Sequence, residues 1–273
     1  MNEVRHFDKI PGVPEFNCLE LAPKRSEYAL LIPVINEGDR ILAELSRAKE
    51  YNVSSYADII ILDGGSDDGS CDPSVLQDLD VTALLTKLGE GRQGAQFRMG
   101  IWWSVTKDYK AVITIDGNNK DSIEDVPHFI DKIKQGYDFV QGSRFIKGGH
   151  AVNTPLSRLL AVKLLHAPII SLKAHHRFTD TTNAYRAYSM RYLKDERVKP
   201  LRDIFNTYEL LAYLSVRATR IGLTACEIPV SRVYPAKGKT PTKISPVKGN
   251  WNLFKILILN LFGKYDPPKD RNA

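Results

Sequence analysis

The amino-acid sequence predicts an α/β fold with a mostly parallel central sheet and helices on both faces. Three observations carry this prediction: short apolar runs rich in β-branched residues, helical spacing between the runs, and polar or glycine-rich turns after them. The composition agrees, because a chain of 273 residues with 43% hydrophobic and 26% charged residues is typical of a globular protein. It excludes a disordered or fibrous chain.

Six apolar runs are the expected strands. Their apolar residues are nearly continuous instead of alternating, which is typical of strands covered on both faces of a sheet. Because strands alternate with helical stretches, most of these strands are expected to run parallel. In chain order the runs cover residues 28–34, 57–63, 81–85, 111–116, 138–143 and 223–230.

The helices follow from spacing and capping residues. Between the first two strands, apolar residues recur at helical intervals at positions 41, 42, 45 and 48. Ser122 and Asp125 resemble a capping box that opens a helix over 122–135. Pro168 is expected to kink or break a later helix because proline lacks an amide hydrogen. Two longer helices are expected in the second half of the chain, over 155–173, which contains Pro168, and over 202–220.

Composition divides the chain into an N-terminal extension (1–27), a main domain (28–234), and a basic loop with an amphipathic tail (235–273). Residues 231–273 hold nine Lys or Arg and two Asp, so the tail is expected to meet a phosphate-rich partner. The apolar stretch 251–262 fits either a helix in a membrane interface or a helix packed on the body. No motif supports nucleic acid as a partner.

The cellular context is inferred from features that the sequence lacks. No apolar run reaches the roughly eighteen residues that a membrane-spanning helix needs, and the charged start has no apolar signal segment. Three widely spaced cysteines, Cys18, Cys71 and Cys226, are expected to be reduced thiols. These features predict a cytoplasmic protein and give no indication of its oligomeric state.

Polar or glycine-rich turns follow five consecutive predicted strands, at the point where each strand ends. Ligands of open α/β sheets bind beyond the carboxyl ends of the strands, so these turns are expected to form one site. The turns contain Asn36 and Glu37, then 63–70, 89–94 and 116–121, and finally Ser143 and Arg144.

Two of these turns have alternative interpretations. GEGRQG at 89–94 matches the dinucleotide pattern G-x-G-x-x-G, which would indicate an oxidoreductase, but it follows the third strand and not the first. Asp116 and Asn118 end a buried-type strand two residues apart. Their oxygens either share a Mg²⁺ or Mn²⁺ ion that holds a diphosphate, or simply form a turn.

Taken together, the turns resemble glycosyltransferase family 2, most closely its polyprenyl-phosphate (dolichol-phosphate) mannosyl- and glucosyltransferase branch. The resemblance implies a GT-A fold with a Rossmann-like sheet in residues 28–234, a nucleotide-sugar donor, a divalent cation, and inversion at the anomeric carbon. The similar segments run in family order over about three quarters of the chain: LLIPVINEGDRI (30–41), IIILDGGSDDGS (59–70), GEGRQGAQFRMGI (89–101), VITIDGNNKDSIEDVPHFI (112–130), FVQGSRFIKGG (139–149), FTDTTNAYRAYS (178–189) and CEIPVSRVYP (226–235).

The resemblance assigns donor-side roles to individual residues. Asp63 would contact the base or ribose, and Arg92 would face the donor. Asp116, with Asn118, would hold the metal ion. The whole nucleotide-sugar site would contain Pro33, Asn36, Glu37, Asp63, Arg92, Asp116 and Lys243.

The acceptor side is assigned in the same way. Arg144 and Arg158 match two arginines that bind the acceptor phosphate in the polyprenyl-phosphate branch. Asp180 and Arg186 match a family segment that lies near the acceptor. The expected catalytic residues are Asp116, Arg144, Arg158 and Asp180.

The chain departs from the family pattern at several positions. Asn118 stands where the family has a second aspartate, and Lys120 stands at the next ligand position. The Lys120 ammonium is therefore a candidate to replace part of the ion's charge. Val162, four residues after Arg158, replaces the usual serine of the branch. The loop at 235–250 is longer than usual and is expected to close over the donor phosphates.

The expected function is inverting transfer of a hexose from a nucleotide sugar, of the GDP-mannose or UDP-glucose type, to a polyprenyl phosphate. The protein would then bind peripherally to the cytoplasmic face of a membrane. Two alternatives stay open. One is a soluble glycosyltransferase acting on a glycan or protein hydroxyl, for which Asp180 is a candidate base. The other is a non-catalytic homologue that binds sugar nucleotides.

Overall fold

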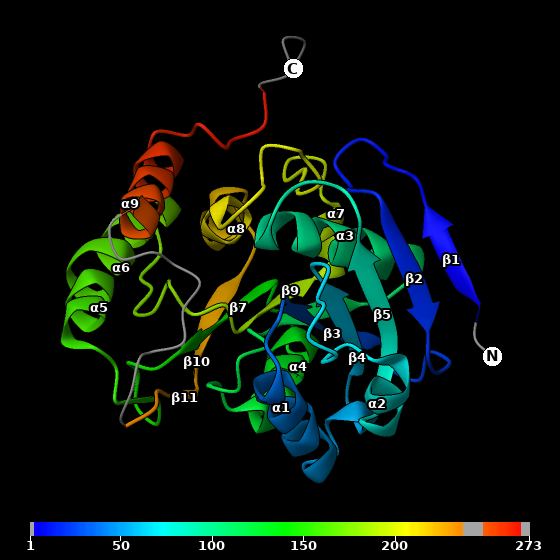
Figure 1. Cartoon of the computed structure of the whole chain (residues 1–273). Helices are drawn as coiled ribbons and strands as arrows, with labels where there is room; N and C mark the ends of the chain where they lie inside the picture. The colour runs from blue at the N-terminus through cyan, green and yellow to red at the C-terminus, as the bar shows by residue number, and fades with distance from the viewer. Residues whose placement is uncertain (1–2, 237–247, 269–273) are drawn as a thin grey trace.

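The computed structural model describes residues 3–236 and 248–268. Its centre is a nine-stranded sheet with helices on both faces (Figure 1). The strands lie in the order β1 (Val4–Phe7), β2 (Phe16–Glu20), β5 (Val81–Lys87), β4 (Asp58–Asp63), β3 (Tyr28–Val34), β6 (Ala111–Thr114), β9 (Arg186–Ser189), β7 (Phe139–Ser143) and β10 (Ala225–Pro229). A separate parallel pair consists of β8 (His150–Val152) and β11 (Ser231–Val233).

The six strands predicted from apolar runs are all present and point in the same direction. The neighbours β5, β4, β3 and β6 pair parallel, and β7 pairs parallel with β10. Between β6 and β7 lies β9, antiparallel to both. Every residue of β4 is buried, as expected for a strand covered on both faces. The predicted α/β class is confirmed.

The main sheet also contains three strands that the apolar runs do not predict. The extension 1–27 carries β1 and β2, which add antiparallel to β5. In β2 the pattern alternates, with Phe16 and Cys18 buried, as is usual toward a sheet edge. Two polar residues interrupt the pattern of β9, whose Arg186 is 2% exposed. The run 111–116 ends as a strand at Thr114, because Asp116 already belongs to the following turn.

Helices and turns pack into two apolar cores, one on each face of the sheet. The helices are α1 (Asp39–Glu50), α2 (Pro73–Asp78), α3 (Gln93–Thr106), α4 (Val126–Lys134), α5 (Leu156–Ala161), α6 (Ala167–Ala174), α7 (Met190–Lys194), α8 (Glu209–Arg220) and α9 (Lys248–Leu261). Two 3₁₀ turns, η1 (Val53–Ser55) and η2 (Ile123–Asp125), and one π turn, η3 (Val162–His166), complete them. One core uses α1, α2 and α4, and the other uses α3, α6, α8 and α9.

Three helix predictions need adjustment. The stretch 122–135 starts as η2 and becomes α-helical at Val126; Ser122 does bind Asp125 but caps no helix. The stretch 155–173 is one helix, α5–η3–α6, and the π turn ends at His166, two residues before Pro168, whose missing amide cannot support regular bonding. The helix expected over 202–220 begins only at Glu209.

The stretch 251–262 forms most of α9, which packs against α6 and α8. Ile256 and Leu257 are buried there, and Asn260 donates a hydrogen bond to the α8 backbone. The packed-helix interpretation of this stretch is therefore confirmed. Within the described residues, none of the helices combines the length and apolarity needed to cross a membrane. Most of the predicted loop 235–250 lies outside the described residues.

Candidate active site

The turns after β3 and β4 are bound to each other. Asn36 has a φ of 46°, accepts a hydrogen bond from Asp67 N at 2.9 Å and donates its own amide to Ser66 Oγ at 3.0 Å. Asp63 is 3% exposed, and its Oδ1 accepts from the amides of Gly65 and Ser66. Because Val34 pairs with Asp63 in the sheet, one rim carries the predicted nucleotide residues Pro33, Asn36, Glu37 and Asp63.

The turn after β6 carries the predicted metal residues and packs tightly on β3. A Cβ atom on Gly117 would lie 3.1 Å from a β3 carbonyl oxygen, which explains the glycine. Asp116 accepts from Gln93 Nε2 at 3.2 Å and from Arg232 Nη2 at 3.1 Å. Asn118 Oδ1 is buried and has no hydrogen-bond partner among the described residues. The turn therefore presents one carboxylate and one unsatisfied amide oxygen.

Arg232 is a site residue that the sequence analysis did not identify. It lies in β11, is 6% exposed, and binds both Asp116 and Asp121. Burial acts to lower the pKa of Arg232, but the carboxylates of Asp121 and Asp116 outweigh it and raise the pKa well above its usual value. A permanent cation therefore lies at the predicted metal turn. The only signal for it in the sequence is its place in the segment CEIPVSRVYP.

Three cations gather around the ring of Tyr234, and we call these four residues the Tyr234 cluster. The distances to the ring centroid are 5.5 Å for Lys120 Nζ, 5.6 Å for Arg158 Cζ and 5.7 Å for Arg232 Cζ. Arg158 Nη1 also donates to Tyr234 Oη at 2.9 Å. Burial acts to raise the pKa of Tyr234, but Arg232, Arg158 and Arg144 together lower it below its usual value. The cluster thus gathers three cations, of which Arg232 is already paired with Asp116 and Asp121, and it suits a phosphate group.

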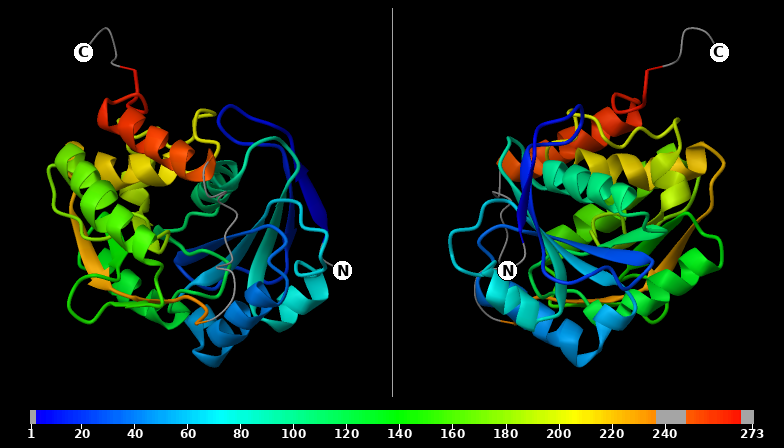
Figure 2. Two further views of the ribbon diagram at one scale, coloured as in Figure 1. Left: turned by 60° about the vertical axis from the view of Figure 1, so that its left-hand side comes forward. Right: turned by 90° about the vertical axis from the view of Figure 1, so that its right-hand side faces the viewer.

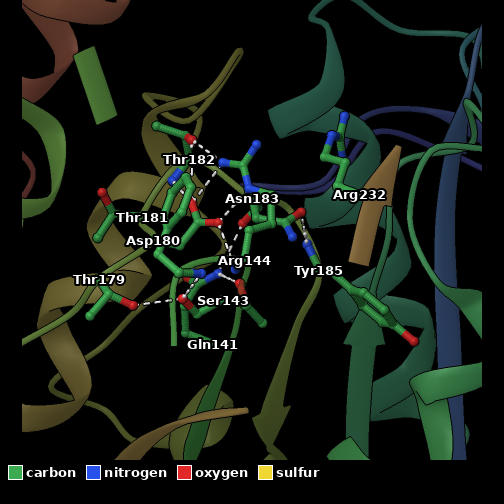
Figure 3. Close-up of polar contacts among 12 residues, drawn as sticks. Gln141, Ser143, Arg144, Thr179, Asp180, Thr181, Thr182, Asn183, Tyr185 and Arg232 are labelled. Atoms are coloured by element: carbon green, nitrogen blue, oxygen red, sulfur yellow. Dashed lines mark hydrogen bonds and ion pairs between the residues drawn. The ribbon is translucent and has the colours of Figure 1, made fainter. Parts of the chain in front are cut away.

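Arg144 and Asp180 bind each other inside the protein (Figure 3). Arg144 Nε lies 2.6 Å from Asp180 Oδ2 and Nη2 lies 2.9 Å from Oδ1, with side chains 2% and 0% exposed. Glu227 Oε1 accepts from the amides of Thr179 and Asp180 and so fixes the loop that carries the aspartate. Each of these two predicted catalytic residues therefore neutralises the other.

Two further buried side chains hold the site turns in place. The Arg186 guanidinium, which belongs to the segment predicted to lie near the acceptor, donates to the backbone oxygens of Thr181, Asn183 and Leu211. Glu44 in α1 was not identified from the sequence; its Oε2 accepts from Asn119 N at 2.7 Å. Burial, reinforced by nearby acidic residues, raises the pKa of Glu44 well above 4.5, although the Asn119 amide opposes this.

The remaining predicted residues, Arg92 and Lys243, were both assigned to the donor. Arg92 is exposed and directly precedes α3, with its amide bonded to Asn206 O at 2.9 Å. A Cβ atom on Gly94 would lie 2.6 Å from Phe205 O. Close packing of α3 therefore explains why residue 94 is a glycine, and no bound dinucleotide is needed to explain this position of the 89–94 pattern. Lys243 lies outside the described residues.

A parallel sheet with such a site at its carboxyl edge is the arrangement of GT-A glycosyltransferases. Among solved structures, glucosyl-3-phosphoglycerate synthase from Mycobacterium tuberculosis shares this fold, with a TM-score of 0.62, 15% identity, and coverage of 89% of this chain and 81% of that chain. The family model described as Glycosyl transferase family 2 matches residues 29–198. The chain therefore belongs to this family, and the predicted glycosyltransferase class is confirmed over the oxidoreductase alternative.

Curated relatives also agree with the predicted branch. The chain is 24% identical to polyprenol monophosphomannose synthase of Mycolicibacterium smegmatis, covering 87% of this chain and 88% of that protein. It is 26% identical to undecaprenyl-phosphate mannosyltransferase of Micrococcus luteus, covering 77% and 85%. A dolichyl-phosphate hexose transferase of Haloferax volcanii is 30% identical over 55% of this chain and 61% of its own length.

Proposed function

We propose that this protein transfers a hexose from a nucleotide sugar to a polyprenyl phosphate, with inversion at the anomeric carbon. One observation carries the proposal: the Tyr234 cluster places Lys120, Arg158 and Arg232 together beside the Asp116 turn. An acceptor phosphate and a leaving diphosphate both need concentrated positive charge. The names of the curated relatives support a polyprenyl phosphate as the acceptor.

The donor is proposed to lie along the turns after β3, β4 and β6. Asn36 and Asp63 on the interlocked turns would border the nucleoside, with Pro33 and Glu37 beside them. Arg92 at the start of α3 would face the diphosphate. A GDP-mannose or UDP-glucose type of donor remains our expectation. The role of Lys243 also remains a prediction.

A divalent cation at Asp116 and Asn118 is part of the proposal. The part of the chain that is described contains no group of three or more His, Cys, Asp and Glu side chains placed to hold a metal. The buried, unsatisfied Asn118 Oδ1 beside the Asp116 carboxylate nevertheless fits Mg²⁺ or Mn²⁺, which are often held by one or two protein oxygens plus substrate phosphates. Solved structures of glucosyl-3-phosphoglycerate synthase contain Mn²⁺ or Mg²⁺ together with UDP. A bound ion would add positive charge at the donor diphosphate.

The chain's own residues supply the other requirements of the reaction. A polyprenyl phosphate is already ionised at pH 7, so its attacking oxygen needs no general base. Arg158, held by Tyr234, would orient that phosphate, because a guanidinium matches phosphate geometry. Arg92 and Arg232 would balance the charge that develops on the leaving diphosphate.

The Arg144–Asp180 pair favours a phosphate over a hydroxyl acceptor. A hydroxyl acceptor would require a carboxylate to take its proton, and Asp180 is a candidate for that role. Both Asp180 oxygens already accept hydrogen bonds from Arg144, and the side chain is 0% exposed. A buried Asp180 bound in this way is better suited to hold Arg144 and the 179–183 loop in position than to accept a proton from a substrate.

Transfer of radiolabelled mannose or glucose from GDP-mannose or UDP-glucose to a polyprenyl phosphate in detergent tests the proposal. Asp116→Asn is expected to lower turnover about 10²–10³-fold while the melting temperature stays close to that of the unmodified protein. Asp131→Asn on the exposed side of α4 is the matched control and should leave turnover unchanged. Specific donor binding without transfer to any acceptor would favour the non-catalytic alternative.

A further inference from the structure

The helix formed by α5, η3 and α6 is apolar on two opposite sides. Its inner side belongs to the core, where Val162, Ile170 and Ala174 are at most 3% exposed. Its outer side carries four leucines that are 67%, 47%, 73% and 67% exposed, and we call them the leucine face: Leu156, Leu160, Leu164 and Leu172. A helix that is apolar all round is normally covered all round, and a contiguous exposed apolar surface indicates an interaction site.

The π turn in this helix helps to keep the leucines on one side. In a regular α-helix, each step of four residues advances about 40° beyond a full turn, so residues at this spacing wind around the axis. In η3 the hydrogen bonds span five residues instead of four. The wider turn offsets the drift between Leu160 and Leu172. The leucine face is thus a consequence of both the spacing and the local helix geometry.

The charged side chains of this helix are all positive, and one of them, Lys173, is paired with Asp266 at 3.2 Å. Residues 156–174 contain Arg158, Lys163 and Lys173 and no acidic residue; the nearest acids in sequence are Asp138 and Asp180. Lys163 is exposed. An apolar helix face with flanking lysine and arginine complements a bilayer that contains anionic lipids, because leucines enter the acyl boundary while cations meet the phosphates.

We propose that the leucine face docks this protein on an anionic lipid bilayer. This inference rests on the proposed function, because a polyprenyl phosphate acceptor resides in a bilayer, and it adds the surface that binds this bilayer. Arg158, which follows Leu156 in the first turn of α5, reaches Tyr234 Oη at 2.9 Å. Docking through this helix therefore brings a membrane-borne phosphate to the Tyr234 cluster.

This assignment differs from the membrane-interface alternative that the sequence left open for another segment. The lysine-bearing stretch 251–262 was the candidate for the membrane interface, but α9 uses Ile256 and Leu257 to pack on the body. The neighbouring helix presents the larger exposed apolar face instead. Figure 2 shows α5, α6 and α9 grouped on one side of the molecule, away from the N-terminal strands.

Co-sedimentation with vesicles of phosphatidylcholine and phosphatidylglycerol tests the docking surface. The variant Leu160→Gln/Leu164→Gln/Leu172→Gln is expected to bind at least about a hundredfold more weakly, since each buried leucine contributes about tenfold. Lys163→Glu should weaken binding several-fold, and pure phosphatidylcholine should bind the unmodified protein less. Tyr51→Gln/Val75→Gln is the matched control: these residues are 52% and 36% exposed, near α1 and in α2, across the molecule (Figure 1).

Two outcomes of the vesicle assay would overturn the proposal: no binding of the unmodified protein, or equal binding of the triple-leucine variant. Unchanged vesicle binding together with loss of a dimer, measured by light scattering, would assign the leucine face to a second copy of the chain. Transfer to a short-chain, water-soluble polyprenyl phosphate separates docking from catalysis. The triple variant should keep that activity and lose transfer to acceptor in vesicles. Failure of the unmodified protein with the soluble acceptor would count against the proposed function, while vesicle binding still decides the docking surface.

Discussion

Replacing Asp180 by asparagine is expected to destabilise the fold strongly, which must be measured before any loss of activity is interpreted. The two hydrogen bonds between Arg144 and Asp180 are 2.6 and 2.9 Å long, between side chains that are 2% and 0% exposed. Asp180→Asn leaves the guanidinium buried without its counter-ion. Removing one partner of such a pair costs about 3–5 kcal/mol of unfolding free energy. In a protein of this size the melting temperature should fall by roughly 6–20 °C.

Urea and thermal unfolding measure this effect, with transfer assayed in parallel. Arg144→Met/Asp180→Leu replaces both charges by apolar groups and is expected to recover most of the stability. Transfer should stay lost in this double variant if Arg144 also contributes to phosphate binding. Asp195→Asn removes a carboxylate from an ion pair at the surface with Arg197 and should cost less than about 1 kcal/mol. If Asp180→Asn were as mild as this control, the argument from burial would be wrong.

Three further substitutions test other parts of the site. Folding raises the pKa of Glu44 above 4.5, so the folded protein retains a proton that the unfolded chain releases. The free energy of unfolding should therefore fall as pH rises above about 4.5, by at most about 1.4 kcal/mol per pH unit. Glu44→Gln should remove this slope in urea titrations, and an unchanged slope would contradict the burial argument. Gly94→Ala should lower the unfolding free energy by about 1–3 kcal/mol, because the new Cβ lies 2.6 Å from Phe205 O; differential scanning calorimetry showing no loss would refute this. Tyr234→Phe removes the 2.9 Å hydrogen bond to Arg158 and should raise the acceptor KM about tenfold with little change in melting temperature; an unchanged KM would argue against the Tyr234 cluster as the acceptor site.

The strands and their turns were predictable because their signals are local. Continuous apolar runs predicted β3 over 28–34, as observed, and parallel pairing then placed the turn after each strand at one edge. The expectation that Asn36, Asp63 and Asp116 lie on neighbouring turns follows from this topology alone. Family resemblance added roles, and those roles remain predictions wherever no contact tests them.

The side-chain partnerships were not predictable because they join residues far apart in the chain. Arg232 binds Asp116 across 116 positions, and no periodicity links the two segments. Similarly, Arg186 interrupts the apolar pattern of β9, so the sequence does not predict this strand. The buried Arg186 guanidinium is satisfied by backbone oxygens that only the folded structure supplies. A buried charge of this kind violates the local pattern and is tolerated only with partners that the fold supplies.

The sequence by itself determined the sheet, the direction of its main strands and the edge that carries the candidate site, because backbone pairing follows apolar patterns within short segments. The tertiary structure alone decided which charged side chains are paired inside the protein and which side chains are exposed. It paired Arg144 with Asp180 in the interior, placed Arg232 at the turn predicted to hold a metal, and left Leu164 on the exposed side of its helix. These outcomes depend on desolvation and on distances between remote segments, and both arise only when the chain is folded.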